Sequence, residues 1–333
     1  SSDPSPAGIR FLFDDHQTWS LSPLEMLSIF DRYEIVEITE RSKIRRYMPH
    51  VAEIVDEPVD HKPGFVAQMR AFLNGGATTR EAAQRVHDLA AESPDKATTT
   101  DADLTAPVPD PPKLLCLAGN YAEHIREGGG IALEKEQTTP RVFMKPPSTT
   151  IVGPGDAIVI PRNAGWIDWE AELAIVMGRR GKYIDAADAL DYVAGYTIVN
   201  DVSERQFVID KDREARDGDK WFDWLNGKWF DTFAPQGPCL VTTDEIPDPD
   251  NLRIALRVNG ASKQDSTTAA MIFTCAELIE WVSRNVTLEP GDIISTGTPA
   301  GVGNTKGTHL KAGDKLEASI EGIGVLKNTM VLG

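Results

Sequence analysis

Three carboxylates stand at every second position of one short stretch: Asp168, Glu170 and Glu172 in "DWEAELAIVMG". The apolar residues 173–177 follow directly and predict a buried strand, on which alternate side chains share a face. A further acid, Asp201, comes directly after the next apolar strand, in "YTIVNDVSER". Buried acids repel one another and lose their hydration unless a cation lies between them. The pattern therefore indicates acids that share a positive charge.

Oxygen ligands with no Cys or His partner suit a hard divalent ion. We expect Glu170, Glu172 and Asp201 to bind Mg²⁺ or Mn²⁺, with Ca²⁺ as an alternative. The competing interpretation is that these are solvated acids on an edge strand. The apolar run behind two of the acids, and the third acid at the end of the next strand, favour the metal site.

A histidine and a glutamate stand three residues apart in "GNYAEHIREGGG", at His124 and Glu127. On a helix these side chains share a face and interact. A carboxylate that hydrogen-bonds to imidazole raises its basicity and fixes its tautomer, as a water-activating base requires. The glycines at 128–130 predict the end of the helix and a following segment that moves as a lid. An ordinary surface pair is the open alternative.

Three cations accompany these acids: Arg205 in "DVSERQ", Lys228 in "NGKWFDTFAPQGP" and Lys145 in "FMKPPST". A cation beside such a site can hold an anionic substrate and stabilise developing negative charge. Each can instead form an ion pair with another acid of the chain. The glycine-rich segment 294–304 lacks the Gly-Lys-Ser/Thr of a nucleotide-binding loop, so we expect its amides and Thr296 to hold a carboxylate or carbonyl oxygen instead.

The elements that must position these residues are short and β-rich. Residues 93–112 are rich in Pro, Asp and Thr and predict a linker. After the linker, apolar segments broken by Gly and Pro predict an α+β, mostly β domain with mixed strand pairing over 113–333. Before it, residues 78–93 carry a helix-capping pattern, and we expect a smaller N-terminal α/β domain over 1–92.

Composition excludes several classes of protein. The net charge of −17 argues against nucleic acid as a partner. The sequence shows no apolar window long enough to cross a membrane, and its start lacks the form of a signal peptide. The cysteines at 116, 239 and 275 lack CxxC spacing and indicate thiols in a reducing compartment. We therefore expect a cytoplasmic protein.

Ordered blocks over about residues 113–333 resemble the fumarylacetoacetate hydrolase superfamily. The blocks are "GNYAEHIRE", "FMKPPSTTIVGPGDAIVIP", "DWEAELAIVMG", "GYTIVNDVSER", "KWFDTFAPQGP", "ISTGTPAGVG" and "IEGIGVLKN". The resemblance implies the mixed β-sandwich roll of that superfamily and a homodimer. It implies the same three acids as metal ligands, and a lid-borne dyad of His124 and Glu127. It also implies substrate contacts from Arg205, Lys228 and Thr296.

The sequence departs from the superfamily's pattern near the expected substrate pocket. Gln206 and Val208 stand where Asp and Gln are common, and the stretch 206–227 is longer than expected. A first "KWFD" makes Lys220 a rival of Lys228, but only Lys228 precedes "TFAPQGP".

Together these features predict metal-dependent hydrolysis of a carbon–carbon bond in a small 1,3-dicarbonyl acid, such as an acylpyruvate or a diketo acid. The ion would polarise the carbonyl and stabilise the departing enolate. His124, oriented by Glu127, would activate water, and Lys228 would offset negative charge. The alternative is decarboxylation of an oxaloacetate-like 2-oxo acid, or keto–enol isomerisation, at the same metal site. A metal-stabilised binding protein is a third, non-enzymatic hypothesis.

Overall fold

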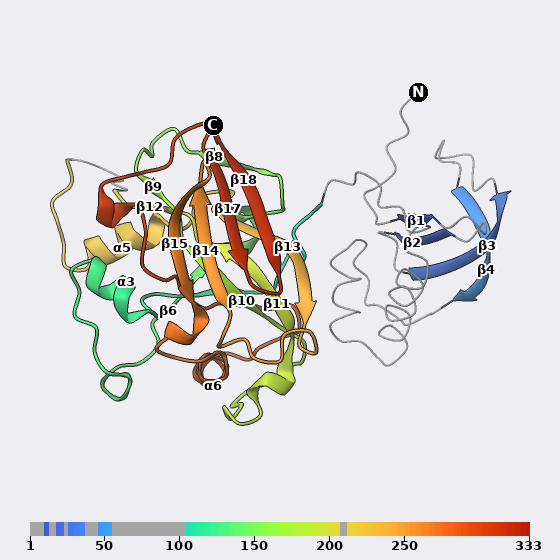
Figure 1. Ribbon diagram of the computed structural model, residues 1–333, viewed down its shortest axis with the longest axis horizontal. Coiled ribbons are helices and arrows are strands. Elements are labelled where there is room, and N and C mark those ends of the chain that lie inside the picture. Colours follow the sequence, from blue (N-terminus) through green and yellow to red (C-terminus); the bar gives the residue numbers. More distant parts are fainter. Residues whose placement is uncertain (1–9, 13–17, 23–25, 37–45, 55–103, 207–211) are drawn as a thin grey trace. The chain divides into compact units, whose positions relative to one another are not determined.

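The computed structural model describes residues 104–206 and 212–333 in full, together with four strands of the preceding region. Those strands are β1 (Arg10–Leu12), β2 (Thr18–Ser22), β3 (Met26–Val36) and β4 (Arg46–Ile54), which pair antiparallel in that order (Figure 1). Backbone contacts divide the chain into two units, 1–103 and 104–333. The expected helix at 78–93 and the linker residues 93–103 lie outside the described residues. The proposed boundaries at 92 and 112 therefore stay a prediction.

A mixed sheet has three of the four acids that the sequence singled out in or directly beside two of its strands. Its order is β6-β5-β16-β10-β11-β13-β7. Its strands are β5 (Leu114–Leu117), β6 (Val142–Lys145), β7 (Ile151–Val152), β10 (Ala171–Met177), β11 (Val193–Asn200), β13 (Ala234–Thr242) and β16 (Ile293–Ser295). β10 pairs antiparallel with β11 and β16, whereas β5 and β16 are parallel. Every residue of β10 is buried, as its apolar run predicts for a central strand.

A second sheet packs against the first. It has the order β15-β14-β17-β18-β8. Its strands are β8 (Ala157–Ile160), β14 (Arg253–Val258), β15 (Ala261–Thr267), β17 (Lys315–Ile320) and β18 (Gly324–Leu332). Burial alternates along β14 and β17, as in a strand with one face in the core and one toward water. β10 and β11 contact these two strands, so the sheets form a sandwich (Figure 1).

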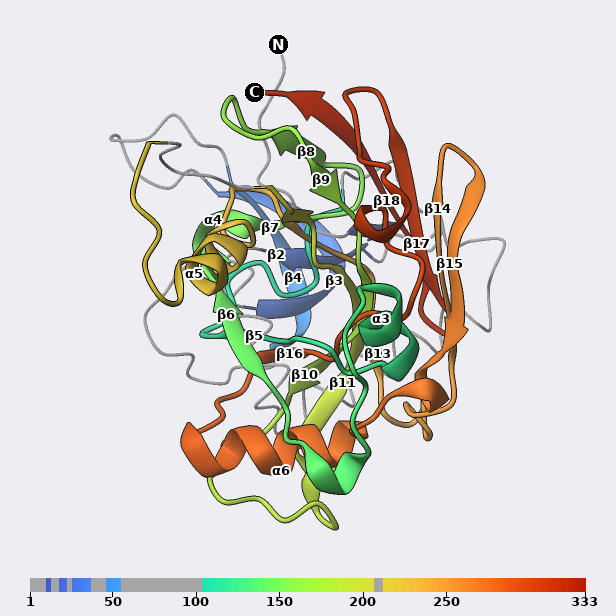
Figure 2. The same cartoon turned by 90° about the vertical axis from the view of Figure 1, so that its left-hand side faces the viewer.

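The helices are short and lie around the sandwich. They are α3 (Ala122–Glu127), α4 (Pro147–Thr150), α5 (Asp219–Asn226) and α6 (Cys275–Asn285). Single 3₁₀ turns occur at η1 (Lys135–Gln137), η2 (Ala189–Tyr192), η3 (Thr268–Ala270) and η4 (Asn304–Lys306). α5 lies beside β6 (Figure 2), where the rings of Phe143 and Trp224 meet with their centres 5.0 Å apart. Among the described helices, none has the length and apolar character of a membrane span.

The predicted mostly β fold of mixed pairing is confirmed. One local expectation differs. A two-residue strand, β9 (Ile167–Asp168), pairs with β12 (Ser203–Glu204), and β10 begins only at Ala171. Trp169 and Glu170 lie between the two strands. The stretch that carries the alternating acids is thus interrupted in its middle.

Candidate active site

Glu170, Glu172 and Asp201 converge on one point. β10 and β11 run antiparallel with Ala171 opposite Asn200, so the start of one strand meets the end of the other. The amide of Asp201 donates to the carbonyl of Glu170 at 2.8 Å. All three acids are buried, and one oxygen from each lies within 4.8 Å of the others. The structure therefore brings together the three acids that the sequence pairs with a metal.

Two of these carboxylates are held by cations of the same chain. Nζ of Lys228 lies 2.6 Å from Oε2 of Glu170 and 2.6 Å from Oδ2 of Asp201. Arg205 binds the other oxygen of Glu170, and Lys145 binds the other oxygen of Asp201. Burial acts to raise the pKa of Glu170, but the charges of Arg205 and Lys228 outweigh it and hold that pKa well below its usual range. The carboxylate of Glu170 is therefore kept ionised.

Glu172 has a different environment. Its Oε2 accepts hydrogen bonds from the Ser295 hydroxyl and, at 3.0 Å, from the Gly297 amide. Its Oε1 is buried and has no hydrogen-bond partner among the described residues. Burial, with the charges of Asp201 and Glu170, raises the pKa of Glu172 well above its ordinary value. A divalent ion between the three acids would supply the missing partner, and an all-oxygen donor set fits Mg²⁺ or Mn²⁺.

Asp168 does not join this group, contrary to the expected shared face. Its carboxylate accepts from the amides of Gly303, at 2.6 Å, and Asn304, at 3.1 Å. It also accepts from Nε of Arg205 at 3.0 Å. The break in strand pairing at Trp169 and Glu170 ends the alternation and lets Asp168 turn to these donors. Asp168 thus positions Arg205, which in turn binds Glu170.

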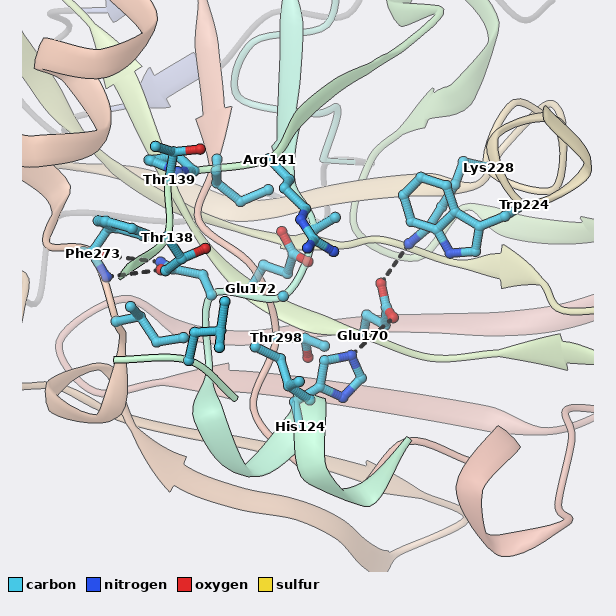
Figure 3. A pocket seen from close by; sticks show the side chains of 18 of the residues that line it. His124, Thr138, Thr139, Arg141, Glu170, Glu172, Trp224, Lys228, Phe273 and Thr298 are labelled. Carbon is cyan, nitrogen blue, oxygen red and sulfur yellow. Dashed lines mark hydrogen bonds and ion pairs between the residues drawn. The ribbon is translucent and has the colours of Figure 1, made fainter. Parts of the chain in front are cut away.

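The expected dyad is formed at the edge of the same site. Helix α3 ends at the first glycine of the triplet, as its sequence predicts. Nδ1 of His124 lies 3.0 Å from Oε1 of Glu127. Nε2 of His124 lies 4.0 Å from Oε1 of Glu170, a contact that Figure 3 shows. The backbone amide of Gly301 donates to both oxygens of Glu127 at 3.0 Å. Glu127 therefore orients the imidazole and also joins α3 to the glycine-rich segment.

The glycine-rich segment holds carboxylates of its own chain. The backbone amide of Gly301 donates to Glu127, and the backbone amide of Gly303 donates to Asp168. A Cβ on Gly301 would lie 2.2 Å from the carbonyl oxygen of Lys263, and its φ of +112° suits glycine alone. The expectation that these amides bind carboxylate oxygens is met by side chains of the protein itself.

Replacement of Gly303 by Ala tests this positioning role. The new Cβ would lie 2.4 Å from the carbonyl oxygen of Thr308 and 2.9 Å from Oδ1 of Asp168. We expect a loss of about 1–3 kcal/mol in the free energy of unfolding, and a roughly tenfold lower kcat/KM because Arg205 loses its fixed partner. Thermal unfolding measures the loss of stability, and metal-dependent turnover measures kcat/KM. Gly165→Ala is the control, since nothing lies near its Cβ position; equal effects of the two variants would contradict the role.

A cavity of about 350 Å³ opens over the acids. His124, Glu170, Glu172, Arg205 and Lys228 reach its surface. The remaining walls come from residues 117–120, α3, the segment 131–141, α5, and residues 272–273 and 298. The sequence did not single out four further residues that border this space: Trp221, Arg141, Trp224 and Thr298. Figure 3 labels the last three of them.

A sequence model described as the C-terminal domain of fumarylacetoacetate hydrolase matches residues 113–331. The chain belongs to the fumarylacetoacetate hydrolase family. A Bos taurus relative named oxaloacetate tautomerase FAHD2A, mitochondrial, is 44% identical over 272 residues, which cover 81% of this chain and 82% of that protein.

Two solved structures of this family are similar along most of their length. The 5-carboxymethyl-2-hydroxymuconate delta-isomerase from Mycobacterium smegmatis is 37% identical, with a TM-score of 0.58, over 72% of this chain and 88% of that one. The fumarylacetoacetate hydrolase from Exiguobacterium antarcticum is 27% identical, with a TM-score of 0.65, over 98% of this chain and 100% of that one. The solved structures similar to this chain thus include both an isomerase and a hydrolase.

The structure distinguishes the rival lysines of the two "KWFD" repeats. Lys220 is an exposed residue of α5, whereas Lys228 is 2% exposed and binds two of the converging acids. Arg205 also reaches the cavity. Gln206 and Val208 are the two residues that depart from the family's pattern. The backbone amide of Gln206 donates to Oε1 of Glu204 at 2.8 Å, and Val208 lies outside the described residues.

Two predicted substrate contacts do not border the cavity. Lys145 is 1% exposed, and its ammonium binds Asp201 and the carbonyl oxygens of Val202, at 3.0 Å, and Phe233, at 2.6 Å. Thr296 is fully buried and donates to the carbonyl of Leu173 at 3.0 Å. Their donors are satisfied inside the protein, so the structure gives both residues a supporting place behind the cavity wall.

Compartment and assembly are the remaining predictions from the sequence. The Bos taurus relative carries the word mitochondrial in its name, which describes that protein. A cytoplasmic location and a homodimer stay predictions for this chain.

Proposed function

We propose that this enzyme is a divalent-metal-dependent keto–enol isomerase that acts on a 2-oxo acid of the oxaloacetate type. The observation that carries the proposal is the unpartnered Oε1 of Glu172, buried beside Glu170 and Asp201 under a cavity that His124 borders. Relatives named for oxaloacetate tautomerase and hydroxymuconate isomerase activity support it. Both names describe proton movement between carbon and oxygen, which passes through an enolate.

Glu170, Glu172 and Asp201 would hold the divalent ion. When bound, the ion supplies Lewis-acid stabilisation of negative charge on the substrate oxygens. The ammonium of Lys228 binds the carboxylates of both Glu170 and Asp201 and holds them close together. Arg205, held by Asp168, fixes Glu170 from the other side.

His124 would move the proton. Glu127 accepts from Nδ1, so Nε2 is left as the basic nitrogen, and it is the nitrogen that lies toward Glu170. In our proposal Nε2 takes a proton from the carbon next to the 2-oxo group and returns one to the enol oxygen, or the reverse. The contact of Glu127 with Gly301 keeps the imidazole in this orientation.

Hydrolysis of an acylpyruvate is the second candidate, and the Exiguobacterium antarcticum hydrolase favours it. The same Nε2 can take a proton from water, and the departing fragment is again an enolate. Decarboxylation of oxaloacetate would use the same stabilisation of negative charge without attacking water. The reactions differ in their products and therefore can be separated directly.

The test supplies the enol of oxaloacetate and acetylpyruvate to the Mg²⁺- or Mn²⁺-loaded chain. Loss of enol absorbance is followed while mass spectrometry identifies the product. We expect metal-dependent conversion of oxaloacetate at unchanged mass. Release of CO₂, or two carbon fragments from acetylpyruvate, without isomerisation would replace the proposal by decarboxylation or hydrolysis. Metal binding without turnover of either compound would favour a binding protein.

A further inference from the structure

Arg141 is a cation of the cavity wall whose side chain has no hydrogen-bond or ion-pair partner among the described residues. The other guanidinium and the ammonium that border the cavity, on Arg205 and Lys228, are bound by carboxylates of the chain. Arg141 therefore leaves a whole guanidinium for a group that enters the cavity.

Strand β6 sets the direction of this side chain. Arg141 directly precedes β6, and its carbonyl accepts from the Ala118 amide at 2.9 Å. Phe143 and Lys145 follow at alternate positions and are buried toward the acids, whereas Met144 between them is exposed. Alternate residues share a face, so Arg141 belongs to the same face as Phe143 and Lys145. Figure 3 shows its guanidinium reaching into the cavity.

Apolar side chains line other parts of the same cavity. Trp221 and Trp224 stack with ring centres 4.9 Å apart, and both line the cavity. Ile131 and Leu133 line it from the segment after α3. These walls contribute no carboxylate that would pair with Arg141. They suit the carbon body of a small ligand that has polar groups at both ends.

We propose that Arg141 binds a second carboxylate of the substrate and makes the enzyme selective for 2-oxo dicarboxylic acids. This rests on the proposed function, in which Glu170, Glu172 and Asp201 hold the ion that receives the 2-oxo acid end. A guanidinium matches a carboxylate with two parallel hydrogen bonds, which an ammonium cannot reproduce. A monocarboxylic 2-oxo acid of the same length leaves Arg141 without a partner.

A matched pair of ligands tests the proposal by binding alone. 2-Oxoglutarate and 2-oxopentanoate differ in one terminal carboxylate, and titration calorimetry with the Mg²⁺-loaded chain measures both. We expect the dicarboxylate to bind on the order of 10- to 100-fold more tightly to the wild type. Arg141→Met should remove this preference and leave the affinity for 2-oxopentanoate within about twofold. Arg141→Lys should retain part of it.

Arg162→Met is the control, because Arg162 is exposed and does not line the cavity; it should keep the full preference. Equal binding of the two acids by the wild type, or a preference that survives in Arg141→Met, would overturn the proposal. Turnover of oxaloacetate separates the Arg141 hypothesis from the proposed isomerase reaction. A preference that depends on Arg141, without oxaloacetate isomerisation, would leave the Arg141 role standing and refute the proposed reaction. Isomerisation of oxaloacetate by Arg141→Met with an unchanged KM would support the proposed reaction and refute the Arg141 role.

Discussion

Replacement of Glu172 by Gln is expected to abolish metal-dependent turnover, with kcat/KM at least about a thousandfold lower, while the chain stays folded. Gln is the same size, and its amide oxygen can still accept from Ser295 and Gly297, the two donors to Glu172 Oε2. The amide would occupy the position of the unpartnered Oε1 but carries no charge with which to bind a cation. A neutral amide also costs less to bury than a carboxylate without a partner.

The measurement is the dependence of Tm on Mg²⁺ or Mn²⁺. A ligand that binds only the folded chain stabilises it by about 2.7 kcal/mol at a concentration 100 times its Kd. We expect the wild type to show such a shift and Glu172→Gln to lose it. Asp292→Asn is a matched control, because Asp292 also has a buried oxygen without a partner among the described residues. Its other oxygen pairs with Lys113, and it is not one of the three converging acids. A metal-dependent shift that persists in Glu172→Gln would refute the site.

Replacement of His124 by Asn is expected to lower kcat by about 10²- to 10⁴-fold, the usual contribution of a general acid–base group. The metal-dependent rise in Tm should remain, since His124 is not among the three converging acids. The two readouts separate proton transfer from metal binding. Turnover is measured at saturating metal with the enol of oxaloacetate.

His309→Asn provides the comparison for that variant. His309 packs against Trp166, with ring centres 4.6 Å apart and the rings tilted by 32°, and it does not line the cavity. We expect its kcat to match the wild type. Wild-type turnover in His124→Asn would exclude the proposed base, and loss of the metal-dependent Tm shift would show that His124 supports the metal instead.

The sequence by itself determined the features that depend on local pattern. The apolar run after Glu172 predicted a central buried strand, and β10 is buried throughout. The glycine triplet after Glu127 predicted the end of a helix, and α3 ends there. The positions of Glu170, Glu172 and Asp201 beside two apolar runs predicted that these acids would converge, because the ends of neighbouring antiparallel strands meet.

Only the tertiary structure decided which charged side chains pair with one another. Asp168 belongs to the same alternating run as Glu170, yet it binds amides 135 and 136 residues away, because strand pairing stops between the two acids. Lys220 and Lys228 have the same local sequence, yet Lys228 alone of the two is buried against the acids. Arg141 gave no local signal, because a side chain without a partner is recognised only after every neighbour is placed. Local sequence pattern determines which side chains are buried and which face of a strand or helix they lie on. The pairing of charged side chains depends on contacts between segments that are distant in the sequence.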